Sequence, residues 1–366
     1  MREGTLKVLM IGRATLDSSP GGDSVQLYST AKYLRLVGVE VDVHLSNESI
    51  KYEKYDIIHF FNIIRPDDIL SHIKRTTLPF VISTIFVDYS EFERLNRKGL
   101  QGIITRSFSG DNLEYLKAIA RYFLNGDKIQ SRYYLLNGHK ASVNYVSLKS
   151  KALLPNSHSE YQRFIEKYKS NKNYRKIPNA IDLSVFDDFV TPNEKFRDHI
   201  ICVGRIEGRK NQLNLLIALS NTDYKVTLIG QQSPNHKAYY EECLRIIESN
   251  PNFRIINHIG HSELSSIYKA AKVHVLASWF ETTGLSSLEA AAMGCNIVVS
   301  RKGDTEEYFE DMAFYCDPGD ISSIRSQVDA AFVSGFNITL RQKIRREYTW
   351  ARAAEDTYSA YKSVLS

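Results

Sequence analysis

The sequence SWFETTGLSSLEAAAMG, residues 278–294, lies between two short apolar runs, VHVLA at 273–277 and NIVVS at 296–300. Apolar runs of this length predict buried strands, and the leucine and alanine residues between them recur at helical spacing. The three segments therefore predict a β-α-β unit. Further apolar runs alternate with helical patterns on both sides of it, which indicates an α/β protein with parallel sheets.

The start of this predicted helix is a candidate anion site. Thr282 or Thr283 is expected to cap the helix, because a threonine hydroxyl can accept a hydrogen bond from a first-turn N–H group. The backbone N–H groups of Gly284 and Leu285 would then point away from the helix and bind phosphate. A glycine here removes the side chain that would block close approach.

Two acids flank this helix start. Glu281 is expected in the loop at the carboxyl end of the strand, and Glu289 in the second helical turn. Carboxylates in these positions suit the hydroxyl groups of a sugar phosphate. The alternative is an ordinary helix that covers the sheet and carries solvated acids.

A second charged segment follows another predicted strand. The run HIICV at 199–203 precedes GRIEGRK at 204–210, and a helix is expected from Asn211. Arg205 and Lys210 at such a junction suit a diphosphate, because arginine binds two oxygens in plane while lysine acts as a point charge. A solvated basic loop is the alternative interpretation.

The N-terminus repeats the pattern of strand, glycine loop and helix. The strand KVLMIG at 7–12 is followed by SSPGGDS at 18–24 and by a helix with Leu27, Ala31 and Leu34 on one face. The loop lacks both Gly-x-Gly-x-x-Gly and Gly-Lys-Ser/Thr, which excludes the dinucleotide fingerprint and the P-loop. Gly21 and Gly22 remain candidates for a phosphate-approaching turn, or form a simple turn.

Further strands are predicted at 39–45, 56–61 and 80–84, and later at 225–230 and 253–259. Ligands of parallel sheets bind at the carboxyl ends of the strands. His59, Asp88 and Glu91 are therefore candidates for the acceptor side of a site. Acids in a loop can equally be solvated.

Composition bounds the class of protein. The 366 residues suit two domains, and 43% hydrophobic with 24% charged residues is typical of globular proteins. The four cysteines include no Cys-x-x-Cys pair, which favours reduced core thiols in a cytoplasmic protein. No apolar run reaches the roughly 18 residues of a membrane-spanning helix.

Charge is unevenly distributed. The net charge is +5, but residues 94–176 contain 17 Lys and Arg against 5 Asp and Glu, a local +12 that leaves −7 for the rest. Such a region can contact an anionic membrane or attract a pyrophosphate-linked acceptor. A solvated surface is the alternative, and no nucleic-acid partner is expected because no binding motif accompanies the charge.

Two motifs resemble those of glycosyltransferase family 4. Two glutamates separated by seven residues, with Gly-Leu between them and Ala-Ala after the second, resemble one motif, and Gly-Arg with a lysine five residues after the arginine resembles the other. Three positions differ from the usual family pattern. Thr282-Thr283 replace Gly-Phe, Asn211 replaces a common glycine, and Phe86 stands where many members have a histidine.

The resemblance implies the GT-B architecture, in which two Rossmann-like β/α/β domains face each other across a cleft. An N-terminal acceptor-binding domain is expected over residues 1–178 and a C-terminal nucleotide-sugar-binding domain over 179–348. A final helix at 349–366 is expected to pack back on the first domain. The last strand of that domain is expected within 145–154.

The resemblance also implies residue roles. Glu281 would lie near the transferred sugar as a catalytic residue, and Arg205 and Lys210 would stabilise the departing diphosphate. The implied donor-binding residues are Glu289, Gly284, Leu285, Thr283, Gly21 and Gly22. On the acceptor side stand His59, Asp88 and Glu91.

The implied activity is that of a retaining, hexosyltransferase-like enzyme that moves a sugar from a nucleotide-diphosphate sugar to a glycan or lipid-linked acceptor in cell-envelope polysaccharide synthesis. The sequence contains no Asp-x-Asp, so no metal and no other cofactor is expected. The protein is expected in the cytoplasm, peripheral on the inner face of the membrane. The alternatives are a non-catalytic sugar-nucleotide-binding subunit and a GT-B epimerase or phosphorylase.

Overall fold

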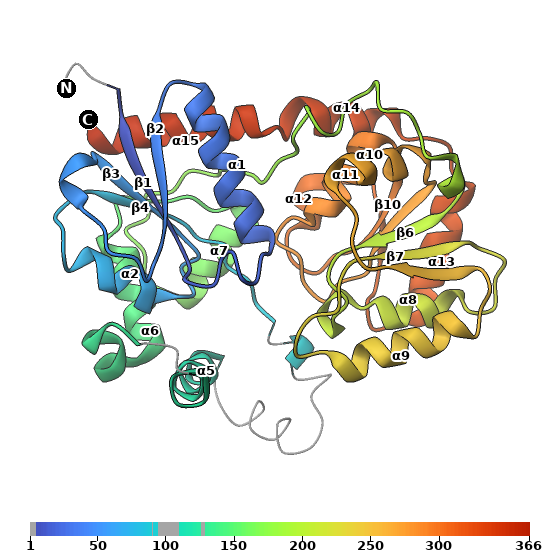
Figure 1. The fold of residues 1–366 in the computed structure, drawn as a ribbon, viewed down its shortest axis with the longest axis horizontal. Coiled ribbons are helices and arrows are strands. Elements are labelled where there is room, and N and C mark those ends of the chain that lie inside the picture. Colours follow the sequence, from blue (N-terminus) through green and yellow to red (C-terminus); the bar gives the residue numbers. More distant parts are fainter. Residues whose placement is uncertain (1–4, 90, 94–109, 126–128) are drawn as a thin grey trace. The chain divides into compact units, whose positions relative to one another are not determined.

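The computed structural model describes residues 5–89, 91–93, 110–125 and 129–366. The chain divides into two compact units, one comprising Met1–Asn179 with Trp350–Ser366 and the other Ala180–Thr349 (Figure 1). The first unit is therefore built from both ends of the chain, and the second is a continuous segment inserted between them.

In its described part, the first unit contains five parallel strands in the order β2-β1-β3-β4-β5. Their bounds are β1 Lys7–Gly12, β2 Glu40–Leu45, β3 Ile57–Phe61, β4 Phe80–Ser83 and β5 Ala152–Leu153. The helices are α1 Gly22–Leu36, α2 Pro66–Ile73, α5 Gly110–Asn125, α6 Arg132–Lys149, α7 His158–Lys167 and α15 Trp350–Leu365, with a short 3-10 turn at Tyr52–Lys54.

Helices pack in pairs in this unit. Helix α15 packs on α1, and α2 packs on α6 (Figure 1). The expected α1 stripe is confirmed, because Leu27, Ala31 and Leu34 are all buried. Strand residues such as Leu9 and Phe60 pack against the helices on the α2 and α6 side. The sheet is therefore apolar where helices cover it, as parallel sheets require.

The prediction of a strand within 145–154 is partly wrong. Residues 145–149 belong to α6, and β5 is only the pair Ala152–Leu153. Within α6, Val143, Val146 and Ser147 are buried at helical spacing. This segment therefore packs as a helix, although its tyrosine and valine residues favour a strand by propensity.

The second unit contains six parallel strands in its described residues, in the order β11-β10-β9-β6-β7-β8. Their bounds are β6 Ile200–Val203, β7 Val226–Ile229, β8 Phe253–Ile256, β9 Val273–Leu276, β10 Asn296–Ser300 and β11 Phe314–Cys316. The helices are α8 Gln212–Leu219, α9 Lys237–Glu248, α10 His261–Ala270, α11 Leu285–Met293, α12 Thr305–Phe309, α13 Ile321–Val333 and α14 Ile338–Glu347, with 3-10 turns at Glu194–Phe196 and Gly208–Lys210.

Both faces of this second sheet are buried. Alternate residues of β6 point to opposite sides, so that Ile201 joins the core beneath α10, α11 and α14, while Ile200 and Cys202 join the core beneath α8, α9 and α13. The continuous apolar runs of the sequence follow from this double burial. The carboxyl ends of the strands carry the loops in which the charged motifs lie.

Two compositional expectations concern thiols and membrane spans. All four cysteines are buried free thiols, as expected for core residues. Across the described ranges, no helix has the length and apolar character needed to cross a membrane.

Candidate functional site

The loop after β6 is fixed to the neighbouring strand by an asparagine. Asn211 adopts a left-handed conformation with φ of 62°, which asparagine tolerates better than most residues other than glycine. Its side-chain amide donates to the carbonyl groups of Ala277, 3.0 Å away, and Pro318, 2.8 Å away. Asparagine thus supplies the backbone conformation of a glycine and also ties the loop to the end of β9.

This arrangement brings together two of the predicted catalytic residues. Lys210 closes the turn before α8, and its Nζ lies 2.6 Å from Oε1 of Glu281. Both side chains are largely buried, with 26% and 10% of their surface exposed. A cation and a carboxylate from two different strand ends therefore form one compact pair.

The backbone of Glu281 is held by the loop that follows β10. The N–H of Glu281 donates to the carbonyl of Lys302, and the N–H of Asp304 donates to the carbonyl of Glu281 at 2.8 Å. Gly303 makes this approach possible, because its φ is +98° and a Cβ atom there would lie 2.0 Å from the Glu281 carbonyl oxygen. A side chain at position 303 is thus excluded by both conformation and space.

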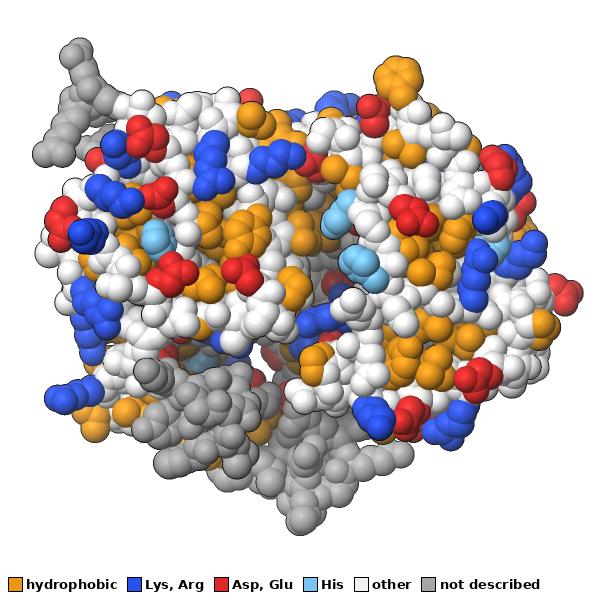
Figure 2. Space-filling model, in the orientation of Figure 1, with side chains coloured by type: hydrophobic (Ala, Val, Ile, Leu, Met, Phe, Trp, Pro, Cys, Tyr) orange, Lys and Arg blue, Asp and Glu red, His pale blue; other side chains and the backbone are white. Residues whose placement is uncertain are grey.

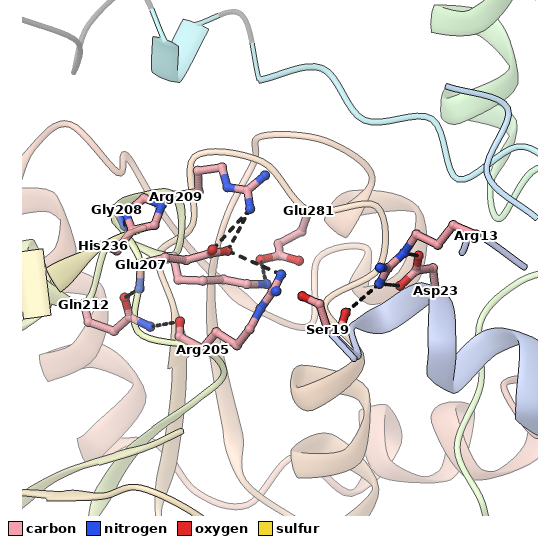
Figure 3. A network of polar contacts seen from close by, with 11 residues as sticks. Arg13, Ser19, Asp23, Arg205, Glu207, Gly208, Arg209, Gln212, His236 and Glu281 are labelled. Carbon is pink, nitrogen blue, oxygen red and sulfur yellow. Dashed lines mark hydrogen bonds and ion pairs between the residues drawn. The ribbon is translucent and has the colours of Figure 1, made fainter. Parts of the chain in front are cut away.

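Arg205 belongs to a second ion cluster in the same loop, which includes two residues that the sequence interpretation missed. Both carboxylate oxygens of Glu207 accept from Nη2 of Arg209, at 3.2 and 3.1 Å, and Nη2 of Arg205 lies 3.9 Å from Glu207 (Figure 3). Burial opposes ionisation of Glu207, but Arg209 and Arg205 outweigh it and lower the pKa of that carboxyl. The acid between two arginines in RIEGRK, residues 205–210, is the sequence signal that could have identified this cluster.

The start of α11 differs from the prediction. Gly284, with φ of +71°, occupies the cap position, and neither Thr282 nor Thr283 caps the helix. The Thr283 hydroxyl instead donates to the Tyr308 hydroxyl at 3.2 Å. Leu285 begins the helix, so its N–H group is among those that have no acceptor within the helix. The first-turn N–H groups of α11 are therefore left without a threonine cap.

Glu289 lies in α11 as expected and is partly buried. The Tyr268 hydroxyl donates to its Oε2 at 3.4 Å. Burial raises the pKa of Glu289 to about 8, although the Tyr268 hydrogen bond acts in the opposite direction. A large part of this carboxyl is therefore protonated at neutral pH when no ligand is bound.

In the first unit, the glycine loop is held by an ion pair. Gly21 is the cap residue of α1, and its N–H donates to the Ser24 hydroxyl at 3.2 Å. Nε of Arg13 lies 2.5 Å from Oδ2 of Asp23, and its Nη2 donates to the carbonyl of Ser19 (Figure 3). Gly22 begins the helix. The sequence interpretation did not identify the Arg13–Asp23 pair.

The structure contradicts the assignment of His59 to the acceptor side. His59 is the central residue of β3, is 1% exposed and uses both ring nitrogens. Its Nδ1 lies 2.7 Å from the Tyr361 hydroxyl and its Nε2 lies 2.9 Å from Ser83 Oγ. Burial lowers the pKa of His59 to about 3, so it is a neutral core residue.

Asp88 and Glu91 follow β4. Asp88 is half-buried and Glu91 is exposed. The segment before them is anchored by the buried Glu160, whose Oε1 accepts from the Thr84 hydroxyl and, at 2.8 Å, from the N–H of Phe86. Between these anchors, Ile85 adopts φ of 47°, an uncommon conformation for a β-branched residue.

A small cavity of about 90 Å³ lies beyond the end of β3 in the first unit. Its polar lining includes Arg65, Asp67, Asp68, Glu114, Tyr134 and His139. Sequence reasoning gave no signal for it, because the lining comes from the start of α2 and from two later helices.

The candidate residues thus fall into two sets. In the second unit, Arg205, Lys210, Glu281 and the start of α11 lie at the carboxyl ends of two neighbouring strands of one sheet, β6 and β9. In the first unit, Gly21 and Gly22 lie at the start of α1, which follows β1, and Asp88 and Glu91 lie in the segment that follows β4.

Comparison with known proteins agrees with this geometry. Residues 186–347 match the family described as glycosyl transferases group 1. The match covers nearly the whole of the second unit, Ala180–Thr349. The family 4 resemblance seen in the sequence is thereby confirmed for the segment that carries both charged motifs.

Curated relatives match less than half of the chain. O-antigen chain mannosyltransferase B of Escherichia coli is 24% identical over 181 residues, 46% of this chain and 46% of that protein. Glycogen synthase of Mycobacterium tuberculosis is 30% identical over 178 residues, 44% of this chain and 42% of that protein. The chain thus spans less than half the length of these two relatives.

Solved structures extend the comparison to the whole chain and confirm the GT-B fold class. Sucrose-phosphate synthase of Thermosynechococcus elongatus has a TM-score of 0.76 at 14% identity, over 98% of this chain and 99% of that one. A glycosyltransferase from Rickettsia africae has a TM-score of 0.72 at 16% identity, over 99% of both chains. HepE of Anabaena, solved with UDP and glucose, has a TM-score of 0.70 at 14% identity, over 98% of this chain and 100% of that one.

Proposed function

We propose that the chain is a glycosyltransferase that moves a sugar, with retention of configuration and without a metal ion, from a nucleoside diphosphate sugar to a glycan or lipid-linked acceptor. The acceptor belongs, on this proposal, to the synthesis of a cell-envelope polysaccharide. The relative named as an O-antigen mannosyltransferase supports this choice of product class.

The pairing of Lys210 with Glu281 at 2.6 Å is the observation that carries the proposal. Glycosyl transfer from such a donor needs positive charge at the departing diphosphate and hydrogen-bond acceptors at the sugar hydroxyl groups. Lys210 and Arg205 supply the charge, and Glu281 supplies the acceptor next to it. Removing one such preorganised group in an enzyme costs about a hundred- to a thousandfold in rate.

The start of α11 adds a further phosphate contact. The first-turn N–H groups and the positive end of the helix dipole favour an anion there. Gly284 places no side chain in the way, and Glu289 in the next turn is positioned for the hydroxyl groups of a ribose. The complexes of HepE with UDP and with UDP-glucose support the choice of a nucleotide-sugar donor.

We propose that the acceptor-binding site lies in the first unit. Exposed leucines lie on α5 and α6, at Leu116, Leu135 and Leu136, and α6 also exposes Arg132, Lys140 and Lys149. On the face that Figure 2 presents, Lys and Arg are interspersed with Asp and Glu over the first unit. We therefore propose a contact with an anionic membrane through α5 and α6.

The first test is a thermal-shift panel of UDP, GDP, CDP and ADP and their glucose or mannose conjugates, with and without EDTA. A ligand present at a hundred times its Kd adds about 2.7 kcal/mol to the free energy of unfolding. One selective diphosphate that binds in EDTA, and whose shift disappears in Arg205→Ala, is expected. If no nucleotide shifts the melting temperature, the proposal of a nucleotide-sugar donor is contradicted. If the shift needs magnesium or manganese, the proposal of a metal-independent reaction is contradicted.

Turnover assays distinguish a glycosyltransferase from a phosphorylase, an epimerase and a non-catalytic subunit. A transferase releases the nucleoside diphosphate in the presence of an acceptor, and Glu281→Ala abolishes this release. A phosphorylase responds instead to free phosphate, and an epimerase converts the donor without an acceptor. Unchanged function in Glu281→Ala would indicate a non-catalytic subunit, and inversion of the anomeric carbon in the product by NMR would contradict retention.

Sedimentation with liposomes tests the membrane contact. The protein is expected to sediment with vesicles that contain anionic lipid and not with neutral ones, because basic residues near the surface add about 1 kcal/mol each. Equal binding to both kinds of vesicle, or none, contradicts this part of the proposal.

A further inference from the structure

We propose that Glu207 is a positioning residue that holds Arg209 beside Arg205, so that Arg209 provides a third cation for the donor diphosphate. The inference rests on the proposed function, because it concerns the same diphosphate. It assigns a binding role to Arg209 and a supporting role to Glu207, neither of which belongs to the Gly-Arg and lysine motif.

The burial of Glu207 is the first step. The residue is 2% exposed, and an ionised carboxylate at such a depth needs charged partners to remain stable. Arg209 supplies two contacts through Nη2, and Arg205 approaches to 3.9 Å. Glu207 therefore anchors the guanidinium group of Arg209 and holds it near that of Arg205.

The position of the two arginines is the second step. Figure 3 shows the guanidinium groups of Arg205 and Arg209 both directed at Glu207, on the same side of the loop as Glu281. Their side chains keep 41% and 30% of their surface exposed, so an anion can approach them from solvent. With Lys210, the loop presents three cations against the two carboxylates of Glu207 and Glu281.

The backbone of the loop is the third step. The N–H of Glu207 donates to Oε1 of Gln212 at 3.4 Å, and Nε2 of Gln212 donates to the carbonyl of Arg205 at 2.9 Å. The N–H of Lys210 donates to the carbonyl of Glu207 at 2.9 Å. Glu207 is thus rigidly placed between the two residues on which the diphosphate is proposed to bind.

The direction in which Glu207→Gln changes diphosphate affinity distinguishes a positioning role of Glu207 from a direct electrostatic effect of its charge. Glu207 is an anion near an anion site, so its direct field weakens diphosphate binding, and Glu207→Gln would strengthen binding if that field dominated. If its role is to keep the guanidinium groups converged, Glu207→Gln weakens binding instead. Without the carboxylate, Arg205 and Arg209 repel each other and turn toward water.

The experiment is calorimetric titration with inorganic pyrophosphate, which does not depend on the base, and with the nucleoside diphosphate selected in the panel. Arg209→Ala is expected to weaken both by about tenfold, because a guanidinium binds phosphate oxygens through charge-assisted hydrogen bonds. Arg209→Lys should recover part of this loss, since it keeps the charge but not the planar fork. Arg325→Ala removes an arginine paired with Asp329 on α13 and should leave both affinities unchanged.

Glu207→Gln is expected to weaken pyrophosphate binding by about five- to tenfold, and to have little further effect in the Arg209→Ala background. Such non-additivity is the signature of a residue that acts through its neighbour. Stronger binding in Glu207→Gln, or additive losses, would overturn the positioning role. If Glu207→Gln does not fold, the Arg209 variants still test whether Arg209 binds the diphosphate.

The two proposals fail in different ways. If Arg209→Ala binds as tightly as the unmodified protein while Arg205→Ala does not bind, only the role of Arg209 as a third cation is contradicted. Absence of binding in the unmodified protein, or binding that is equally tight in Arg205→Ala, contradicts the donor site itself and the third cation with it.

Discussion

Gly303 shows how one missing side chain can shape a site. Its Cα lies against the carbonyl of Glu281, and its φ is +98°. Every other amino acid would be strained here and would also push Glu281 away from Lys210. The glycine is therefore required by the position of a carboxylate on another loop.

Gly303→Ala is accordingly expected to lower donor affinity and turnover by at least tenfold and to cost about 1 to 3 kcal/mol of stability, because it strains the backbone and displaces Glu281. Turnover and thermal denaturation measure the two effects. Gly335→Ala is the matched control, since a Cβ there meets nothing within 4 Å. Equal behaviour of the two variants would contradict the role of Gly303.

Glu289 predicts a pH dependence of stability. Its pKa in the folded protein, about 8, lies above its value in the unfolded chain, so the folded state binds the proton more tightly. This contribution is complete at pH below about 4.5 and is lost as the pH rises toward 8. Glu289→Gln should remove this loss and stabilise the protein at pH 8.5 by roughly 1 to 3 kcal/mol.

Urea denaturation of both proteins at pH 5.5 and 8.5 measures this difference. The variant should gain clearly more stability relative to the unmodified protein at pH 8.5 than at pH 5.5. A gain of the same size at both pH values would mean that packing rather than ionisation is responsible.

Among the elements, α15 links the end of the chain to the first sheet. Tyr361 on this helix is fully buried, and its hydroxyl forms a hydrogen bond with His59 in β3. Tyr361→Phe is expected to cost about 1 to 3 kcal/mol, because a buried imidazole nitrogen loses its partner, and Tyr361→Ala about 3 to 5 kcal/mol, because a cavity is left as well. Chemical denaturation checks both values.

Glu355→Ala on the exposed side of α15 is the control and should change stability by less than about 0.5 kcal/mol. If Tyr361→Phe is as stable as the control, the hydrogen bond to His59 contributes nothing to the first unit.

The elements also show what the sequence could predict. Apolar runs and helical stripes located the strands β1 to β4 and the α1 stripe, because each signal depends only on neighbouring residues. The caps and partners were missed where they are distant in sequence. Thr283 bonds to Tyr308 instead of capping its own helix, and His59 is explained only by Tyr361, 302 residues away.

The residues of the candidate site were also predicted only in part. Arg205, Lys210 and Glu281 were identified from motifs, and the structure places them on neighbouring strand ends. Glu207 and Arg209 were overlooked because a charged loop residue is usually solvated, and only the geometry shows that Glu207 is buried.

At the scale of the whole molecule, both units contain buried neutral histidines. Burial lowers the pKa of His59 and His274 to about 3 and of His72 and His199 to about 4. Since the unfolded chain binds these protons near pH 6.5, stability is present above that pH and is lost as the pH falls toward 4.

Both units should therefore lose several kcal/mol between pH 6.5 and pH 4, at about 1 to 3 kcal/mol for each histidine. Urea denaturation at half-unit pH intervals, followed by circular dichroism, measures this loss. A free energy of unfolding that stays constant over the interval would contradict it.

The way in which the first unit is assembled from both ends of the chain has a consequence for biosynthesis. A ribosome completes Ala180–Thr349 before it has made Trp350–Ser366, so the inserted unit has all its residues while the first unit still lacks α15. Until Trp350–Ser366 has been translated, α1 has no α15 to pack on and His59 has no Tyr361. The unit that begins to form first is thus the last to be finished, and a nascent chain halted before residue 350 exposes apolar surface that chaperones and proteases recognise.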